Sequence, residues 1–134
     1  MTIREIFLEQ DYNCAEAVLR WADERYGLNT APEDFALVSG FGGGLGCGET
    51  CGALLGALAA LSRARVEGRA HATPSFREEC AELVRRFRTD LGSLRCEELK
   101  ERYRRPDVRC LYVVERAAAV LDEYMRFLEE TTHA

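Results

Sequence analysis

The stretch Glu49-Thr50-Cys51-Gly52-Ala53-Leu54-Leu55-Gly56-Ala57-Leu58-Ala59-Ala60-Leu61 largely decides how this chain of 134 residues is expected to fold. Its leucines and alanines recur at helical spacing, which predicts a helix that begins near Glu49. Gly52, Gly56 and Ala60 lie four residues apart and form one smooth stripe on that helix. Small residues let two backbones approach closely, so the stripe predicts tight packing on another helix, within the chain or in a homodimer.

A glycine-rich stretch, Gly40-Phe41-Gly42-Gly43-Gly44-Leu45-Gly46-Cys47-Gly48, comes just before this helix and is expected to be a loop. Glycine lets a backbone approach a ligand closely, which makes Gly42, Gly43 and Gly44 candidate cofactor-binding residues. A thiol at a helix start lies near unpaired N–H groups, which favours the thiolate, so Cys51 is the candidate reactive cysteine. The simpler alternative is that the glycines only turn the chain and permit close helix packing.

Hydrophobic spacing predicts helices along the rest of the chain as well. A capping-box spacing of Thr30 with Glu33, and Thr73 followed by Pro74, suggest two of the starting points. The first expected helix ends at Gly27. The others run from about Ala31 to Ser39, from Thr73 to Gly92, from Ser93 to about Tyr103, and onward from Pro106. No segment alternates as a strand would, so the sequence predicts one all-α domain over residues 1–134, a helical bundle of about five to six helices.

Composition limits the classes of partner. The formal net charge of −5 disfavours non-specific binding to nucleic acid. The longest uncharged apolar stretch, from Thr50 to Ser62, is too short to cross a membrane. The first residues lack the basic and apolar segments of a secretory leader, so we expect a cytoplasmic protein, in which stable disulfides are unusual.

The chain contains six cysteines, which in a reducing compartment are ligands, redox groups or small buried hydrophobes. Their spacing matches no ferredoxin, zinc-ribbon or Cys-x-x-Cys pattern, so spacing alone specifies no cluster. Cys80 lies on the apolar face of its expected helix and is predicted to belong to the core. We expect Cys14 in the middle of a helix, Cys47 in a loop, and Cys51, Cys96 and Cys110 at helix starts. The two histidines, His71 and His133, are expected in a solvated loop and in the terminal tail.

The run Cys51-Gly52-Ala53-Leu54-Leu55-Gly56, with Cys14 before it and Cys96 and Cys110 after it, resembles the small redox-active protein family defined by the pattern C…CGAxxG…C…C. The resemblance extends from Tyr12 to about Ala118 and implies a redox or metal role. The family is similar to part of the split-Soret cytochromes. However, the Cys-x-x-Cys-His haem attachment motif does not occur here, so no haem is expected. Cys47 and Cys80 lie outside the pattern.

Three hypotheses follow. In the first, Cys14, Cys51, Cys96 and Cys110 converge on a thiolate-bound metal, an iron–sulfur cluster in preference to zinc, and exchange electrons with a redox partner that the sequence does not name. In the second, the protein is a thiol–disulfide protein in which another cysteine resolves Cys51. In the third, the chain is a helical interaction domain with buried structural thiols. The sequence assigns no enzymatic reaction.

Overall fold

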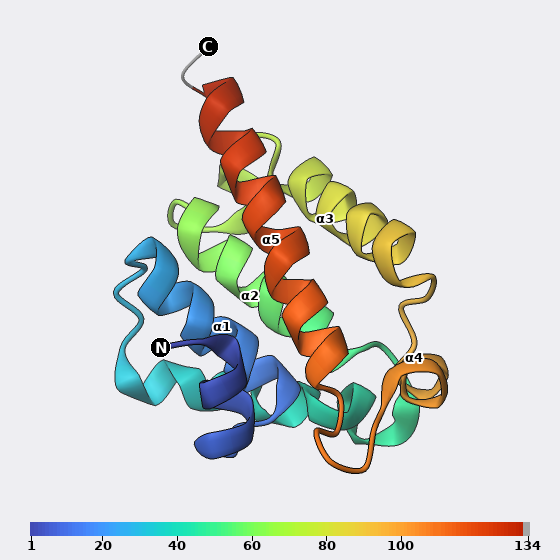
Figure 1. The fold of residues 1–134 in the computed structure, drawn as a ribbon. Helices are drawn as coiled ribbons and strands as arrows, with labels where there is room; N and C mark the ends of the chain where they lie inside the picture. Colours follow the sequence, from blue (N-terminus) through green and yellow to red (C-terminus); the bar gives the residue numbers. More distant parts are fainter. Residues whose placement is uncertain (133–134) are drawn as a thin grey trace.

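The computed structural model describes residues 1–132, which are helical almost throughout (Figure 1). The longer helices are α1 (Cys14–Tyr26), α2 (Gly52–Arg65), α3 (Phe76–Leu91), α4 (Cys96–Tyr103) and α5 (Leu111–Thr132). Shorter helical segments are η1 (Glu5–Glu9), η2 (Pro32–Phe41), η3 (Gly44–Gly48) and η4 (Ala70–Ala72). No strand occurs in the described residues, apart from two isolated backbone bridges, which confirms the predicted all-α class.

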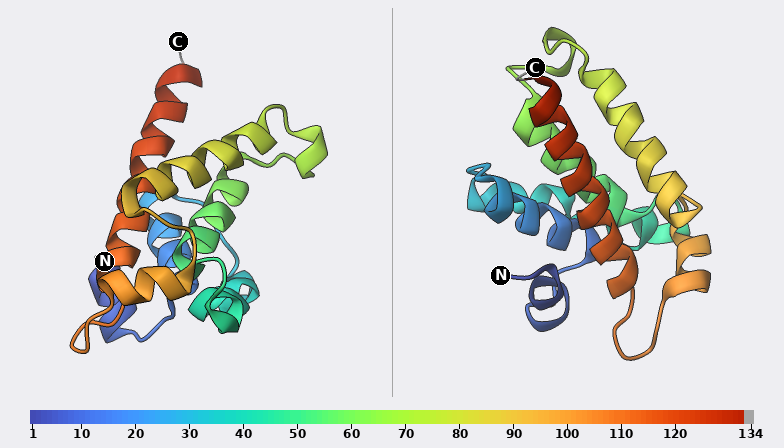
Figure 2. Two further views of the ribbon diagram at one scale, coloured as in Figure 1. Left: turned by 90° about the vertical axis from the view of Figure 1, so that its right-hand side faces the viewer. Right: turned by 45° about the horizontal axis from the view of Figure 1, so that its top comes forward.

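Helices α2 and α5 are the centre of the arrangement: α5 packs against α1, α2 and α3, and α2 packs against α1, α3 and α5. In Figure 1 and in both views of Figure 2, α4 and the glycine-rich segment before α2 lie at the end of the molecule away from the C-terminus. No helix within residues 1–132 is long and apolar enough to cross a membrane.

The predicted apolar helix faces form the core. On α5, Leu111, Val114 and Leu121 are buried, as their spacing predicted. The other helices supply short aliphatic and aromatic side chains to the same core, among them Val18, Leu54, Leu61, Leu83 and Phe87.

Helices α1 and α2 pack closely along the small-residue stripe. A Cβ atom added to Gly56 would lie 2.5 Å from the carbonyl oxygen of Ala15, and one added to Gly52 would lie 2.6 Å from Cys14 Sγ. Such distances are far below van der Waals contact, so only glycine fits at either position. The predicted close approach of α2 to another helix is confirmed, and that helix is α1.

The first predicted helix is wrong in one respect that matters for the site. The apolar pattern from Phe7 to Ala22 is interrupted at Asp11, whose φ of 59° takes the backbone out of the right-handed helical region. The chain restarts with Asn13 as the N-cap of α1, and its side chain accepts a hydrogen bond from the backbone N–H of Glu16 at 3.0 Å. Cys14 is therefore the first residue of α1 and not a mid-helix residue.

Several other predicted helix starts are also displaced. Ala31, and not Thr30, precedes η2, and it makes no side-chain capping bond. Thr73 does not cap α3; its hydroxyl accepts a hydrogen bond from the N–H of Glu67 and donates one to the carbonyl of Arg69, and so fixes the α2–α3 connection. Three more helices begin later than predicted: α2 begins at Gly52 and not near Glu49, α4 at Cys96 and not at Ser93, and α5 at Leu111 and not at Pro106.

Candidate functional site

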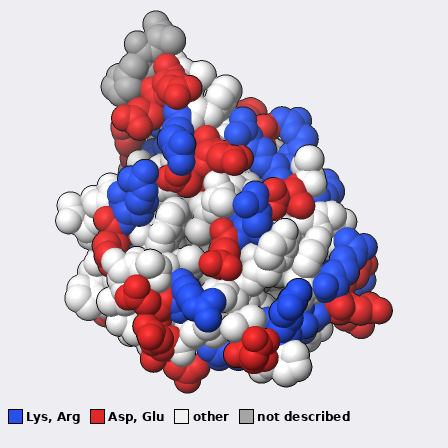
Figure 3. Space-filling model, viewed as in Figure 1, with Lys and Arg blue, Asp and Glu red and all other residues white. Residues whose placement is uncertain are grey.

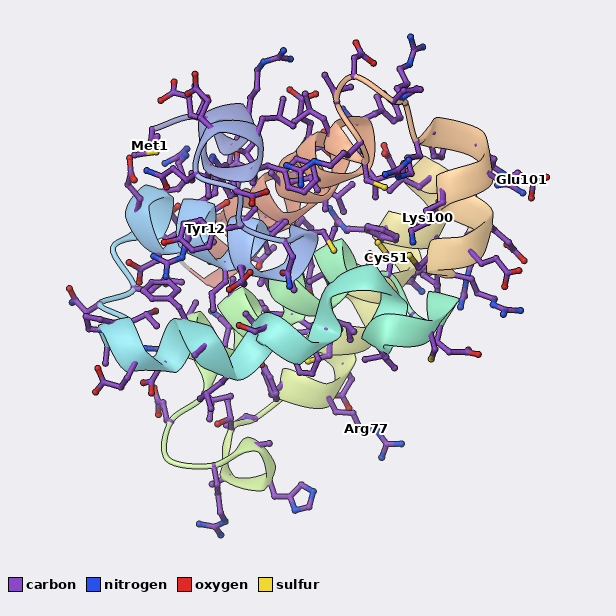
Figure 4. The ribbon with its side chains drawn as sticks, turned by 90° about the horizontal axis from the view of Figure 1, so that it is seen from below. Met1, Tyr12, Cys51, Arg77, Lys100 and Glu101 are labelled. Carbon is purple, nitrogen blue, oxygen red and sulfur yellow. The ribbon has the colours of Figure 1, made fainter. Side chains whose placement is uncertain are left out.

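The four cysteines of the sequence pattern all lie at helix N-termini. Cys14 opens α1, Cys51 is the N-cap of α2, Cys96 opens α4, and Cys110 immediately precedes α5. The start of a helix carries free backbone N–H groups and a partial positive charge. Four such ends near one another favour negative charge at the sulfurs. Figure 4 shows sulfur atoms gathered around the labelled Cys51 and beside α4.

The backbone pairs the segments that carry Cys51 and Cys96. Thr50 and Arg95 form an antiparallel bridge. On either side of it, the N–H of Cys51 donates to the carbonyl of Leu94 at 2.7 Å, and the N–H of Cys96 donates to the carbonyl of Glu49 at 2.6 Å. Residues on either side of a bridge position point to the same face of the pair. The two cysteines are thus held together by main-chain bonds that survive any change of side chain.

Cys14 is positioned by the cap of its own helix. The backbone N–H of Asn13 donates to a Glu16 carboxylate oxygen at 3.0 Å, which completes the capping box, and the Asn13 amide donates to the carbonyl of Ser39 at 2.9 Å. The hydroxyl of Ser39 also donates to Glu16, at 3.0 Å. These bonds attach the end of η2, and with it the start of the glycine-rich segment, to the helix that begins at Cys14.

The glycines leave room for the cysteines. A Cβ atom on Gly44 would lie 2.5 Å from the Cβ of Cys96, and one on Gly42 would lie 2.5 Å from Asn13 Nδ2. Gly43 and Gly44 both have a φ near +65°, which other residues adopt only with strain. The segment Gly42–Gly44 therefore shapes the surroundings of Cys14 and Cys96. Its direct contact with a cofactor stays a prediction.

Each thiol for which a pKa shift is resolved in this group has a raised pKa. Burial, with smaller contributions from the nearby thiols of Cys14 and Cys96, raises the pKa of Cys51 from 9.0 to about 12. Burial also raises the pKa of Cys14, against the effect of the Gly43 N–H, which lowers it, and the neighbouring Cys96 raises it again. For Cys110, burial is again the largest cause of a raised pKa, followed by the proximity of Cys14 and Cys96. The four thiols therefore form one electrostatically coupled group.

The prediction that the helix start lowers the pKa of Cys51 is wrong. Its side chain is only 5% exposed and accepts no capping hydrogen bond. The N–H groups of Leu54 and Ala53 do lower its pKa, but the loss of hydration outweighs them. In the absence of a cation, Cys51 is a neutral thiol at physiological pH.

The other candidate residues lie outside this group. Cys47 is exposed, with its sulfur 3.7 Å from the carbonyl of Gly44, and Cys80 is half-buried against the core on α3. His71 is exposed in the connection between α2 and α3, while His133 lies outside the described residues. Glu49 is exposed and faces Arg95 at 3.9 Å.

The donor set suits a metal, but the positions are not those of a preformed single-ion site. Four thiols are the ligand set of structural zinc and of iron–sulfur clusters. No disulfide joins any of the cysteines, all of which lie in the described part of the chain. Within residues 1–132, however, no three cysteine, histidine or carboxylate side chains are arranged to hold one metal ion.

Residues 12–124 match the family described as "Putative redox-active protein (C_GCAxxG_C_C)". The chain belongs to this family. The family's printed pattern places glycine before cysteine, whereas this chain has Cys51 before Gly52. Searches among curated proteins and among solved structures give no match. The sequence prediction of a redox-active cysteine family is thus confirmed, and a cofactor is not identified.

Proposed function

We propose that Cys14, Cys51, Cys96 and Cys110 together hold a redox-active metal centre, an iron–sulfur cluster in preference to zinc. One observation carries the proposal: four cysteines that are distant in sequence lie at four helix starts, and neighbouring cysteines of this set raise the pKa of Cys14, Cys51 and Cys110. The two remaining cysteines are not in that group.

The raised pKa of Cys51 supports a metal ligand over a free nucleophile. A neutral buried thiol is a poor nucleophile, since the thiolate is the reactive form. A metal cation removes this obstacle because it replaces the proton on the sulfur, and the cost of burying the negative charge is offset. The same observation opposes the alternative in which Cys51 is the attacking thiolate of a thiol–disulfide protein.

Two arguments favour iron and sulfide over zinc. Zinc has no redox chemistry, while the family is described as redox-active. A single zinc ion also needs all its sulfurs about 2.3 Å from one point. An iron–sulfur cluster distributes its thiolates over several irons, so its four sulfurs need not lie around one point.

The residues of the chain would have separate tasks at such a centre. The paired backbone segments fix Cys51 and Cys96 in place. The Gly43 N–H favours negative charge at Cys14, and the helix starts favour it at all four sulfurs. When bound, the cluster would supply one-electron transfer. Burial of Cys51 and Cys96 would keep water from their side of it.

The test is anaerobic reconstitution with ferrous iron and sulfide, followed by iron and sulfide analysis and a visible spectrum. We expect iron, sulfide and a charge-transfer absorption band in the wild-type protein. Serine at Cys14, Cys51, Cys96 or Cys110 should remove or greatly reduce them. Serine at Cys47 or Cys80 provides the matched controls and should leave the iron content unchanged. Equal iron content in all six variants, or none in the wild type, would contradict the proposal.

A further inference from the structure

The four-cysteine site has one side that is open to a partner. Cys51 and Cys96 are 5% and 7% exposed, whereas Cys14 and Cys110 are half-buried, and of these two Cys110 lies in the turn between α4 and α5. A redox centre exchanges electrons most readily where the least protein separates it from the surface. The surface around Cys110 is therefore the place to look for a docking site.

Two cations that form no ion pair within residues 1–132 lie near Cys110. The antiparallel backbone bridge of Arg105 with Arg109 holds the segment of Arg104 beside that of Cys110. Arg104 and Lys100, the only lysine of the chain, both lower the pKa of Cys110, although burial dominates and raises it. Figure 4 shows the Lys100 side chain extending from α4 toward the region of Cys51, while Glu101 points away from it. Charge near the site on this side is thus positive.

The same short segment contains two more arginines. Residues 100–105 carry four cations and one carboxylate, a net charge of +3 in a chain whose formal net charge is −5. No ion pair joins Lys100, Arg102, Arg104 or Arg105 to any carboxylate in the described part of the chain, whereas eight of the other fourteen arginines form one. Figure 3 shows basic side chains over α4 at the lower right, with some acidic ones beside them.

Two aromatic rings, one of them exposed, lie among these cations. The rings of Tyr103 and Tyr112 are 5.0 Å apart, and they line a small hollow of about 210 Å³ with Arg102 and Arg105. Tyr112 is 49% exposed, whereas Tyr103 is half-buried against the core and its hydroxyl donates to the carbonyl of Leu91 at 3.1 Å. Tyrosine and arginine are enriched where proteins bind one another and often supply most of the binding energy.

We propose that this basic surface, formed by Lys100, Arg102, Arg104, Arg105 and Tyr112, docks an acidic partner protein next to Cys110. The proposal rests on the proposed function, because it assigns the partner surface of the same cysteine site. Opposite charges would steer the encounter and orient the partner over Cys110. The acidic remainder of the chain would repel the same partner elsewhere, so that it docks on this side.

The test uses the full chain and a synthetic peptide rich in Asp and Glu, with its Asn and Gln counterpart as the uncharged control. Amide chemical shifts followed during titration should change mainly in residues 100–112. The affinity should fall as salt rises. The double variant Lys100→Glu, Arg104→Glu should lose at least about tenfold in affinity, and Lys100→Gln, Arg104→Gln should lose less.

Arg77→Glu is the matched control, because Arg77 is exposed at the start of α3, away from α4 in Figure 4. It should change the affinity less than about twofold. The proposal would be overturned by chemical-shift changes centred outside residues 100–112, or by an equal loss of affinity in Arg77→Glu. It would also be overturned if the uncharged peptide bound equally well, or if phosphatidylserine vesicles or inorganic triphosphate bound in place of the peptide. Circular dichroism confirms that each variant folds. Iron content separates the two failures: a protein that takes up iron but not the peptide contradicts only the docking surface.

Discussion

Gly52 leaves the space that the sulfur of Cys14 occupies. A Cβ atom on Gly52 would lie 2.6 Å from Cys14 Sγ and 2.6 Å from the carbonyl oxygen of Phe41. The glycine that follows Cys51 in this chain is therefore in contact with a second cysteine of the site, 38 residues earlier. Its role is to let α1 and α2 bring two cysteines together.

Gly52→Ala should accordingly disturb metal binding. The added methyl group meets the Phe41 backbone on one side, which is hard to displace, so the Cys14 side chain must rotate or α1 must shift. We expect iron uptake on anaerobic reconstitution to fall severalfold. Gly40→Ala is the control, because a Cβ atom there meets nothing within 4 Å. Full iron uptake by Gly52→Ala would show that the site tolerates a displaced Cys14.

Gly56→Ala should affect stability more than metal binding. The new Cβ atom would lie 2.5 Å from the Ala15 carbonyl oxygen and 3.0 Å from its Cα, so the two helices must separate. Overpacking of this kind costs roughly 1–3 kcal/mol, and leucine at the same position should cost more. Urea unfolding of the metal-free protein measures the loss. Gly40→Ala should stay within about 0.5 kcal/mol of the wild type, and an equally small effect at Gly56 would contradict the close crossing.

The helical class, the apolar faces and the α2 stripe could be predicted because each depends on local periodicity. The start of α1 is hard to predict because apolar residues recur near helical spacing on both sides of the polar run Glu9-Gln10-Asp11. A signal was nevertheless present, since Asn13 and Glu16 have the spacing of a capping box. The same spacing at Thr30 and Glu33 gives no cap, so the pattern alone does not discriminate between the two positions.

The grouping of the cysteines could be proposed from the sequence only through the family resemblance. The backbone bonds that place Cys96 beside Cys51 join segments 45 residues apart and leave no local pattern. The ionisation of Cys51 was misjudged for a similar reason. A helix start is visible in the sequence, whereas the packing that buries its thiol is a property of the whole fold. The importance of Lys100 and Arg104 also depends on where the α4–α5 turn places Cys110.

The alkylation rates of the cysteines should follow the exposure of their side chains. In the metal-free protein near neutral pH we expect Cys47, which is exposed, to react fastest with iodoacetamide. Half-buried Cys80 should follow, and Cys51 should be slower still, because it is buried and its pKa is raised to about 12. Mass spectrometry of peptides taken at successive times gives the rate for each cysteine. Faster reaction at Cys51 than at Cys80 would mean that the helix start prevails over burial.

The buried thiol of Cys51 also predicts how the stability of the metal-free protein depends on pH. In the unfolded chain this thiol loses its proton near its ordinary pKa of 9.0, and in the folded protein burial delays the loss to about pH 12. Between these values the folded state binds more protons, so stability is complete below pH 9 and falls as the pH rises. One such group contributes a slope of about 1.4 kcal/mol for each pH unit. Urea unfolding at a series of pH values above 9 should therefore give a clearly smaller slope for Cys51→Ala than for the wild type. Cys47→Ala removes an exposed thiol and should retain the wild-type slope. Equal slopes in all three proteins would mean that Cys51 ionises as freely in the folded state as in the unfolded one.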